Sequence, residues 1–94
     1  MDGWTYCQYD QIEHIEKRYT FKKYSRAVAF TNMVTALAET YGHHPRLVIE
    51  WGKVHVAWGT HQSDQGSGVL AKDKALAKRC DELFNLLGQS LDLE

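Results

Sequence analysis

The chain has 94 residues, which is the length of a single domain. Its 11 basic and 12 acidic residues leave a formal net charge of −1, so it lacks the basic surplus that nucleic acid or an anionic membrane attracts. Hydrophobic residues at 44% and charged residues at 24% are the proportions of a folded globular protein and exclude an intrinsically disordered one.

No segment approaches the run of about 18 apolar residues that crosses a membrane, and no basic and apolar leader stands at the start. Cys7 and Cys80 are far apart and form no Cys-x-x-Cys pair, a usage that fits a reducing compartment. We therefore expect residues 1–94 to form one cytoplasmic domain.

The first half of the chain predicts two strands and a helix. Residues 4–9 are rich in aromatic and β-favouring side chains, and residues 13–21 alternate as a half-buried strand does, with His14 on the polar side. Ser25 is a candidate N-cap for a helix that Gly42 ends. The apolar stripe of this helix recurs at steps of three and four and consists of Ala27, Phe30, Val34, Leu37 and Tyr41.

The second half repeats this layout. Residues 47–51 and 54–60 are predicted strands around a turn at Gly52, and a polar loop at 62–68 leads to a helix that ends at Gly88. The inward face of the fourth strand holds Val54, Val56 and Trp58, and that of the helix holds Leu76, Cys80, Leu83 and Leu87. The order ββα–ββα predicts an α+β two-layer sandwich, with both helices on one face of a four-stranded antiparallel sheet.

Three histidines stand where regular structure is predicted to stop. His43 and His44 follow the first helix, and His61 follows the fourth strand. Chain ends of this kind are where a rigid scaffold places its site residues. Histidine also titrates near neutral pH, so it can act as an acid or as a base. Glu39, in the last turn of the helix, is either a surface residue or a group that orients an imidazole.

These residues form part of a longer pattern. The chain resembles the signature of the pterin-4a-carbinolamine dehydratase family at Glu39, His43, His44, Pro45, Trp51, His61 and Asp73. Residues 15–27 (IEKRYTFKKYSRA) look like the family's strand leading into its first core helix, and residues 73–77 (DKALA) are similar to the start of its last helix. The resemblance covers nearly the whole chain from Gly3 onward.

The resemblance implies a reaction and its site. The family removes water from 4a-hydroxytetrahydropterin to give quinonoid dihydropterin, during pterin recycling after aromatic amino-acid hydroxylation. The implied catalytic residues are His43, His44 and His61, and the implied substrate-binding residues are Glu39, Pro45, Trp51 and Asp73.

The chemistry suits histidine. Hydroxide is a poor leaving group, so one imidazole must protonate it while another takes a proton from the ring. We expect His43 and His61 to form this acid/base pair and His44 chiefly to hydrogen-bond the pterin. No redox change occurs, so we expect neither a metal nor another cofactor.

Other interpretations of the same residues stay open. Zinc binding is disfavoured, because Pro45 pushes His44 into extended geometry, in which neighbouring side chains point to opposite sides. Trp51 is either a pocket wall or a core residue, and Asp73 is either a site residue or one that favours the N-terminal dipole of its helix. His55 is interpreted as solvated or facing a second subunit.

The chain departs from the family pattern in several places, three of which lie close to His61 and Asp73 in the sequence. Gly59 stands where the family usually has serine, and the loop at 62–71 is longer than is usual. Leu70-Ala71 replaces a threonine–glutamate pair, so a helix cap is missing that Ser67 could supply. The proposed catalytic groups remain, with room for an altered substrate preference or a slow enzyme.

Both the predicted fold and the family resemblance indicate partners. A small sheet with one open face is often covered by a second subunit, so we expect a homodimer or a homotetramer. The resemblance implies a pterin substrate and a functional link to an aromatic amino-acid hydroxylase, with neither nucleic acid nor membrane as a partner. The alternatives are a coactivator-like protein-interaction module and a pterin-binding protein with little turnover.

Overall fold

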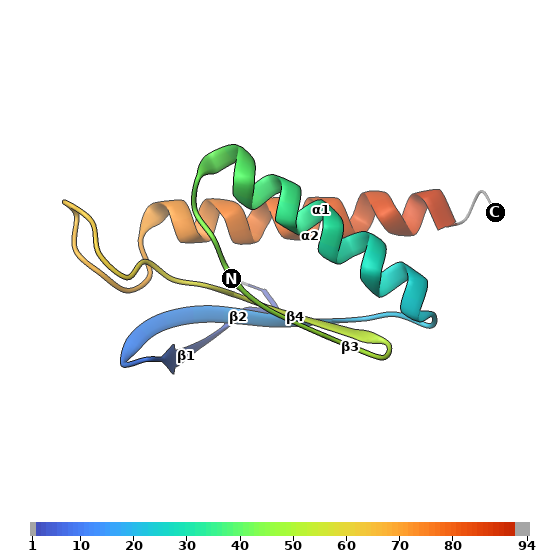
Figure 1. Ribbon diagram of the computed structural model, residues 1–94, viewed down its shortest axis with the longest axis horizontal. Helices are drawn as coiled ribbons and strands as arrows, with labels where there is room; N and C mark the ends of the chain where they lie inside the picture. Colours follow the sequence, from blue (N-terminus) through green and yellow to red (C-terminus); the bar gives the residue numbers. More distant parts are fainter. Residues whose placement is uncertain (1, 92–94) are drawn as a thin grey trace.

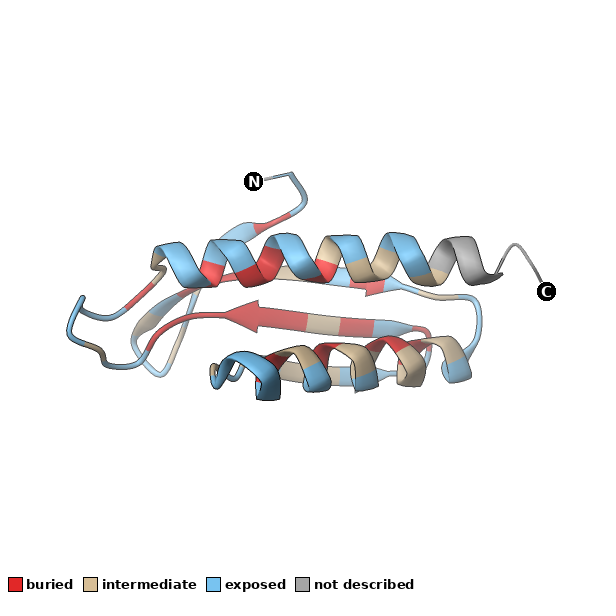
Figure 2. Cartoon of the chain, turned by 90° about the horizontal axis from the view of Figure 1, so that it is seen from above, coloured by how far each residue is buried: buried red, intermediate tan, exposed pale blue. Residues whose placement is uncertain are grey.

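Two helices lie side by side on one face of a four-stranded sheet (Figures 1 and 2). The computed structural model describes the backbone of residues 2–91. The elements in chain order are β1 (Thr5–Tyr9), β2 (Ile12–Thr20), α1 (Tyr24–Tyr41), β3 (Arg46–Glu50), β4 (Lys53–Trp58) and α2 (Ala71–Leu91). The strands pair antiparallel in the order β1-β2-β4-β3. This arrangement confirms the predicted α+β sandwich.

Two tight hairpins set the strand order. Asp10 and Gln11 join β1 to β2 with φ angles of 54° and 66°, the left-handed pair whose twist matches an antiparallel hairpin. Trp51 and Gly52 join β3 to β4, and the Gly52 carbonyl accepts the Phe21 N–H at 2.8 Å. Since β4 pairs with both β2 and β3, it occupies the middle of the sheet and carries its most buried side chains.

Helix α1 ends where the sequence predicts but begins differently. Gly42 takes a φ of 61°, and its N–H bonds to carbonyls of the last turn, including Glu39, so the predicted C-terminal glycine is confirmed. The predicted cap Ser25 is wrong. The N-cap is Lys23, whose extended backbone precedes the helix without a side-chain cap, and Ser25 already lies in the first turn.

The core lies between the sheet and the two helices. Figure 2 shows buried segments in red along the sides of both helices and along the central strands. Trp58 and Phe30 are the largest fully buried side chains, and Cys80 of α2 accepts a hydrogen bond from the Trp58 indole at 3.4 Å. The buried hydrophobic cluster comprises Trp4, Ile15, Tyr19, Ala27, Phe30, Val34, Ala38, Val54, Val56, Trp58, Leu76, Ala77 and Cys80. The inward faces predicted for β4 and α2 are therefore confirmed.

Helix α2 is capped from inside its own first turn. The Asp73 carboxylate accepts the Leu70 N–H at 2.8 Å, so Asp73 supplies the cap for which Ser67 was considered. The predicted end at Gly88 is wrong, because the helix runs on to Leu91. A lone glycine costs a helix only about 1 kcal/mol, and no proline follows it here. Within residues 2–91, no helix combines the length and apolarity needed to cross a bilayer.

Candidate active site

A pocket of about 410 Å³ opens at the end of the sheet where α1 stops and β4 runs into the loop before α2. Its walls are made by Gly42, His43, His44, Gly59, Thr60, His61, Gln62 and Lys72. The three histidines selected from the sequence therefore meet at one pocket, although they come from two segments that are distant along the chain.

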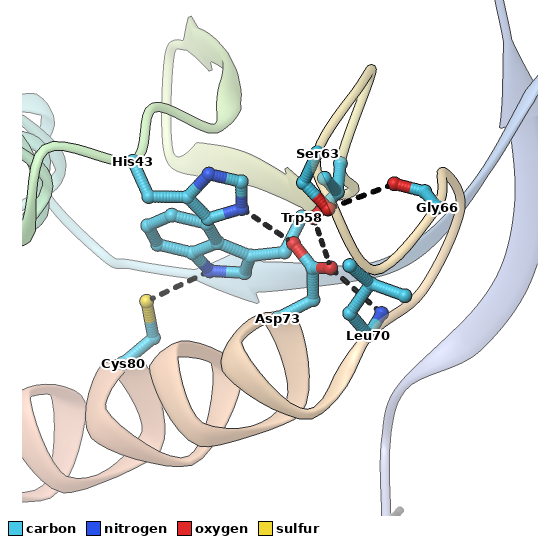
Figure 3. Close-up of polar contacts among 8 residues, drawn as sticks. His43, Trp58, Ser63, Gly66, Leu70, Asp73 and Cys80 are labelled. Carbon is cyan, nitrogen blue, oxygen red and sulfur yellow. Dashed lines mark hydrogen bonds and ion pairs between the residues drawn. The ribbon is translucent and has the colours of Figure 1, made fainter.

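His43 is held on two sides. Its Nε2 lies 2.6 Å from Oδ1 of Asp73, and its ring stacks on Trp58 with 5.8 Å between centroids and 24° between planes (Figure 3). Asp73 has no exposed surface, and its other oxygen accepts the Thr60 hydroxyl and the Leu70 N–H, both at 2.8 Å. A carboxylate placed in this way fixes Nε2–H as the donor and leaves Nδ1 free to exchange a proton.

His44 is held far less firmly. Its Nε2 lies 3.0 Å from Oε1 of Glu39, so the imidazole that Glu39 contacts is that of His44. The His44 and Glu39 side chains are 63% and 74% exposed, and water screens a pair of that kind strongly. Pro45 follows His44 and joins it to β3. Among the described residues, Pro45 is not one of those that form the pocket walls.

His61 is exposed, and its ring meets a fourth histidine. The ring of His14 lies edge to face with that of His61, with 5.9 Å between centroids and 82° between planes. His14 was predicted only to be a residue on the polar side of β2, and it is buried there, with 3% of its surface exposed. Tyr9 and the backbone of Gly59 cover its ring on the open side of the sheet.

The loop that carries His61 is closed at its base. Thr60 and Gly68 exchange two backbone hydrogen bonds of 2.8 Å, which form an isolated antiparallel bridge. At the tip, the Ser63 hydroxyl donates to the Gly66 carbonyl at 2.9 Å (Figure 3). The base of the loop, which holds the site residues, is therefore bonded separately from its tip.

Trp51 is not brought to this pocket. It belongs to the β3–β4 turn, whereas the histidines lie at the other end of the sheet, where the loop before α2 begins (Figure 1). Its surface is 77% exposed, so within this chain it is neither a pocket wall nor a core residue. The cause is the direction of β3, which leads away from His44 toward the turn.

Two further residues lie on the open face of the sheet and are not pocket walls. His55 on β4 accepts a hydrogen bond from Nε of Arg18 at 3.1 Å. Arg46 places its guanidinium 4.2 Å from the centroid of the Tyr9 ring. His55 is partly buried beside Arg18.

Residues 1–83 match the model of the family described as pterin 4 alpha carbinolamine dehydratase. The chain belongs to this family. A relative from Hahella chejuensis, named "Putative pterin-4-alpha-carbinolamine dehydratase", is 43% identical over 82 residues, which cover 87% of this chain and 70% of the relative. A protein of the same name from Vibrio cholerae is 41% identical over 83 residues, covering 88% of this chain and 73% of its own length.

Solved structures agree on the pterin dehydratase fold. The crystal structure of a "transcriptional coactivator/pterin dehydratase" from Brucella melitensis superimposes with a TM-score of 0.73 at 29% identity, covering 88% of this chain and 83% of that one. A pterin dehydratase-like protein identified as a RuBisCO assembly factor gives a TM-score of 0.69 at 23% identity, covering 86% of this chain and 88% of that one. The second likeness concerns the fold alone.

Three residues at the pocket of this pterin dehydratase family member were not predicted from the sequence. Thr60 and Gln62 flank His61, and Lys72 precedes Asp73, so each adjoins a residue that was predicted. Their position next to a predicted site residue was the only sign in the sequence that they belong to the pocket. Position alone does not show which neighbours point toward the pocket, because that depends on how the loop closes.

Proposed function

We propose that the chain dehydrates 4a-hydroxytetrahydropterin to quinonoid dihydropterin by histidine acid/base catalysis. The observation that carries the proposal is the meeting of three histidines at one pocket, one of them bonded to the fully buried Asp73. The family assignment supplies the pterin. With this activity we propose a role in tetrahydropterin recycling beside an aromatic amino-acid hydroxylase, and assembly as a homodimer or homotetramer.

The reaction breaks one carbon–oxygen bond. The lone pair of the pterin N5 forms the new double bond to C4a as the hydroxyl leaves, an imidazolium donates the proton that turns it into water, and a neutral imidazole takes a proton from the ring. The balance is the loss of one water molecule, with no electron transferred to or from the pterin. Each proton transfer by a positioned side chain contributes about 10²–10⁴-fold in rate.

The two histidines of the proposed acid/base pair differ in their surroundings. The Nε2 atom of His43 is hydrogen-bonded to Asp73, which keeps the ring in one orientation. His61 is exposed and has no carboxylate partner in the described part of the chain. We propose His44, with Glu39, as a hydrogen-bonding group for the pterin ring.

The test is loss of the carbinolamine followed by absorbance, with the protein in excess chelator. We expect rapid dehydration by the wild type and a loss of about 100-fold in His43→Ala and His61→Ala. His55→Ala is the matched control, because His55 lies on the sheet away from the pocket. Wild-type turnover no faster than the spontaneous reaction, or equal rates in all four proteins, would refute the proposal.

A binding role is the second candidate. One of the superimposable structures carries the words transcriptional coactivator in its name, and this is the observation that favours it. Such a module would bind its protein partner in the His44→Ala variant as well as in the wild type. A pterin-binding protein would instead retain the ligand tightly without accelerating its dehydration.

A further inference from the structure

We propose that His14 is a positioning residue for His61, and that Gly59 is a glycine because the His14 ring needs its space. The inference rests on the proposed dehydration, in which His61 is one of the two proton-transfer groups. His14 lies on β2, within the sheet, and is not one of the residues that form the pocket walls. It reaches the pocket only through its ring contact with His61.

His14 is itself held firmly. Its Nδ1 lies 2.8 Å from the Ile12 carbonyl oxygen, which can only accept, so Nδ1 carries the hydrogen and donates it. The Tyr9 ring packs edge to face against it, with 5.4 Å between centroids and 89° between planes. With 3% of its surface exposed, His14 has little freedom to reorient. It is therefore a rigid platform rather than a mobile surface side chain.

Gly59 marks the space that this platform needs. A Cβ placed on Gly59 would lie 2.7 Å from both Cγ and Cδ2 of His14, closer than such atoms approach in real structures. Gly59 does not have the positive φ that explains Gly42, Gly52, Gly66 and Gly68. Its lack of a side chain therefore follows from the approach of the His14 ring, together with the Glu13 carbonyl at 2.8 Å from the same Cβ position.

His61 needs such support more than His43 does. His43 has the buried Asp73 on one side and stacks on Trp58. His61 has no bonded carboxylate in the described part of the chain. Its imidazole instead contacts the ring of His14, which belongs to the sheet. A misplacement of about 1 Å in a reacting group can cost about 100-fold in rate, so the loss of this contact should reach the chemistry.

Two substitutions separate the ring from the hydrogen bond. His14→Asn keeps an N–H for the Ile12 carbonyl and removes the ring, whereas His14→Phe keeps a ring and removes the hydrogen bond. His55→Asn is the matched control, since it removes a strand histidine that lies away from the pocket. His14→Gln serves as a second variant without a ring should His14→Asn fail to fold.

Two readouts are taken on each variant. The rate of carbinolamine dehydration should show a kcat about tenfold lower in His14→Asn with KM within about twofold, and near-wild-type values in His14→Phe. Independently of turnover, the Hα–Hβ couplings of His61 in NMR spectra should report one χ1 rotamer in the wild type and in His14→Phe. In His14→Asn the same couplings should be averaged.

The outcomes distinguish this inference from the proposed function. Should the wild type fail to accelerate dehydration, the proposed function fails and the His61 couplings alone decide the positioning role. A His61 rotamer that is equally fixed in His14→Asn and in the wild type would overturn the inference. Equal losses of kcat in His14→Asn and His14→Phe would overturn it too, because they would point to general damage of the strand.

Discussion

Asp73 is the residue on which most of the pocket depends. It is fully buried, and its two oxygens accept hydrogen bonds from His43, Thr60 and Leu70. These partners belong to three different segments, so one carboxylate joins the end of α1, the end of β4 and the start of α2. Asp73 therefore both caps the start of α2, the structural role considered from the sequence, and holds the His43 imidazole through a hydrogen bond.

Asp73→Asn separates these roles. An amide keeps the size of the side chain but removes the carboxylate oxygen that accepts the His43 Nε2–H. The His43 ring then loses its fixed orientation and tautomer, so we expect kcat to fall by about 10–100-fold. Loss of a charged acceptor should also lower the free energy of unfolding by about 1–3 kcal/mol. Carbinolamine kinetics and urea denaturation measure the two effects. Glu82→Gln is the control, because Glu82 is exposed on α2 and lies outside the pocket walls, so we expect neither quantity to change by more than about 0.5 kcal/mol. Equal effects in both variants would contradict this role of Asp73.

At the scale of elements, a second carboxylate joins α2 to the first hairpin. Asp81 accepts hydrogen bonds from Lys17 at 2.8 Å, Tyr19 at 2.5 Å and the Trp4 indole at 3.1 Å. Partial burial raises the pKa of Asp81, but these three hydrogen bonds outweigh it and hold the pKa below its usual value of 3.8. The bonds are therefore stronger to the charged carboxylate than to the neutral acid.

The sign of the pH effect follows from that depressed pKa. Stability from Asp81 is present above its unfolded pKa of 3.8 and is lost as the pH falls through the lower folded value. We expect Asp81→Asn to lower the free energy of unfolding by about 1–2 kcal/mol at pH 7, and its deficit to shrink below pH 4. Thermal melting between pH 7 and pH 2.5 measures this. The exposed neighbour variant Glu82→Gln should show no such convergence, and a deficit in Asp81→Asn that is constant with pH would refute the assignment.

The helices and strands were predictable because they follow patterns among residues that are close in sequence. Positions whose environment depends on residues distant in sequence were not. The stripe through Phe30 and Val34 and the alternation along β4 depend only on neighbours in sequence, so both were recognised. His14 lies on the polar side of its strand as predicted, yet its burial depends on Tyr9 and on the absence of a side chain at Gly59. Contacts among β1, β2 and the residue that follows β4 leave no periodic signal in the sequence of any one strand.

The candidate site divides in the same way. Spacing identified the three histidines, because residues that follow different elements at one edge of a sheet converge without knowledge of side-chain contacts. It could not show that Asp73 bonds to His43, or which imidazole Glu39 contacts. Those pairings depend on how α1 ends and how the loop before α2 folds.

At the scale of the whole molecule, the domain is elongated, with principal extents of 45 × 22 × 22 Å. The histidine pocket lies at one end of the sheet, and the β3–β4 turn with Trp51 lies at the other (Figure 1). The two ends therefore cannot act on one small ligand within a single copy of the chain.

This separation predicts that Trp51→Ala leaves the pocket's chemistry intact. We expect kcat/KM for the carbinolamine to stay within about twofold of wild type, a change of less than about 0.5 kcal/mol in transition-state binding. Lys53→Ala, at the same turn, is the matched control. A loss of tenfold or more confined to Trp51→Ala would instead show that a second copy of the chain brings Trp51 to the pocket, and light scattering of the same sample would then report the assembly.

The bridge between Thr60 and Gly68 makes the loop tip a permissive insertion point. Because two backbone hydrogen bonds close the base, length added around Asp64 and Gln65 is borne by the tip rather than by His61 or Asp73. A short epitope or a single added cysteine could therefore be carried there. Burial, with the nearby Glu16 carboxylate at Cys7, raises the pKa of both Cys7 and Cys80 to about 11, so a fluorophore would couple to the new thiol first. The loop would then serve as an attachment site beside a working pocket.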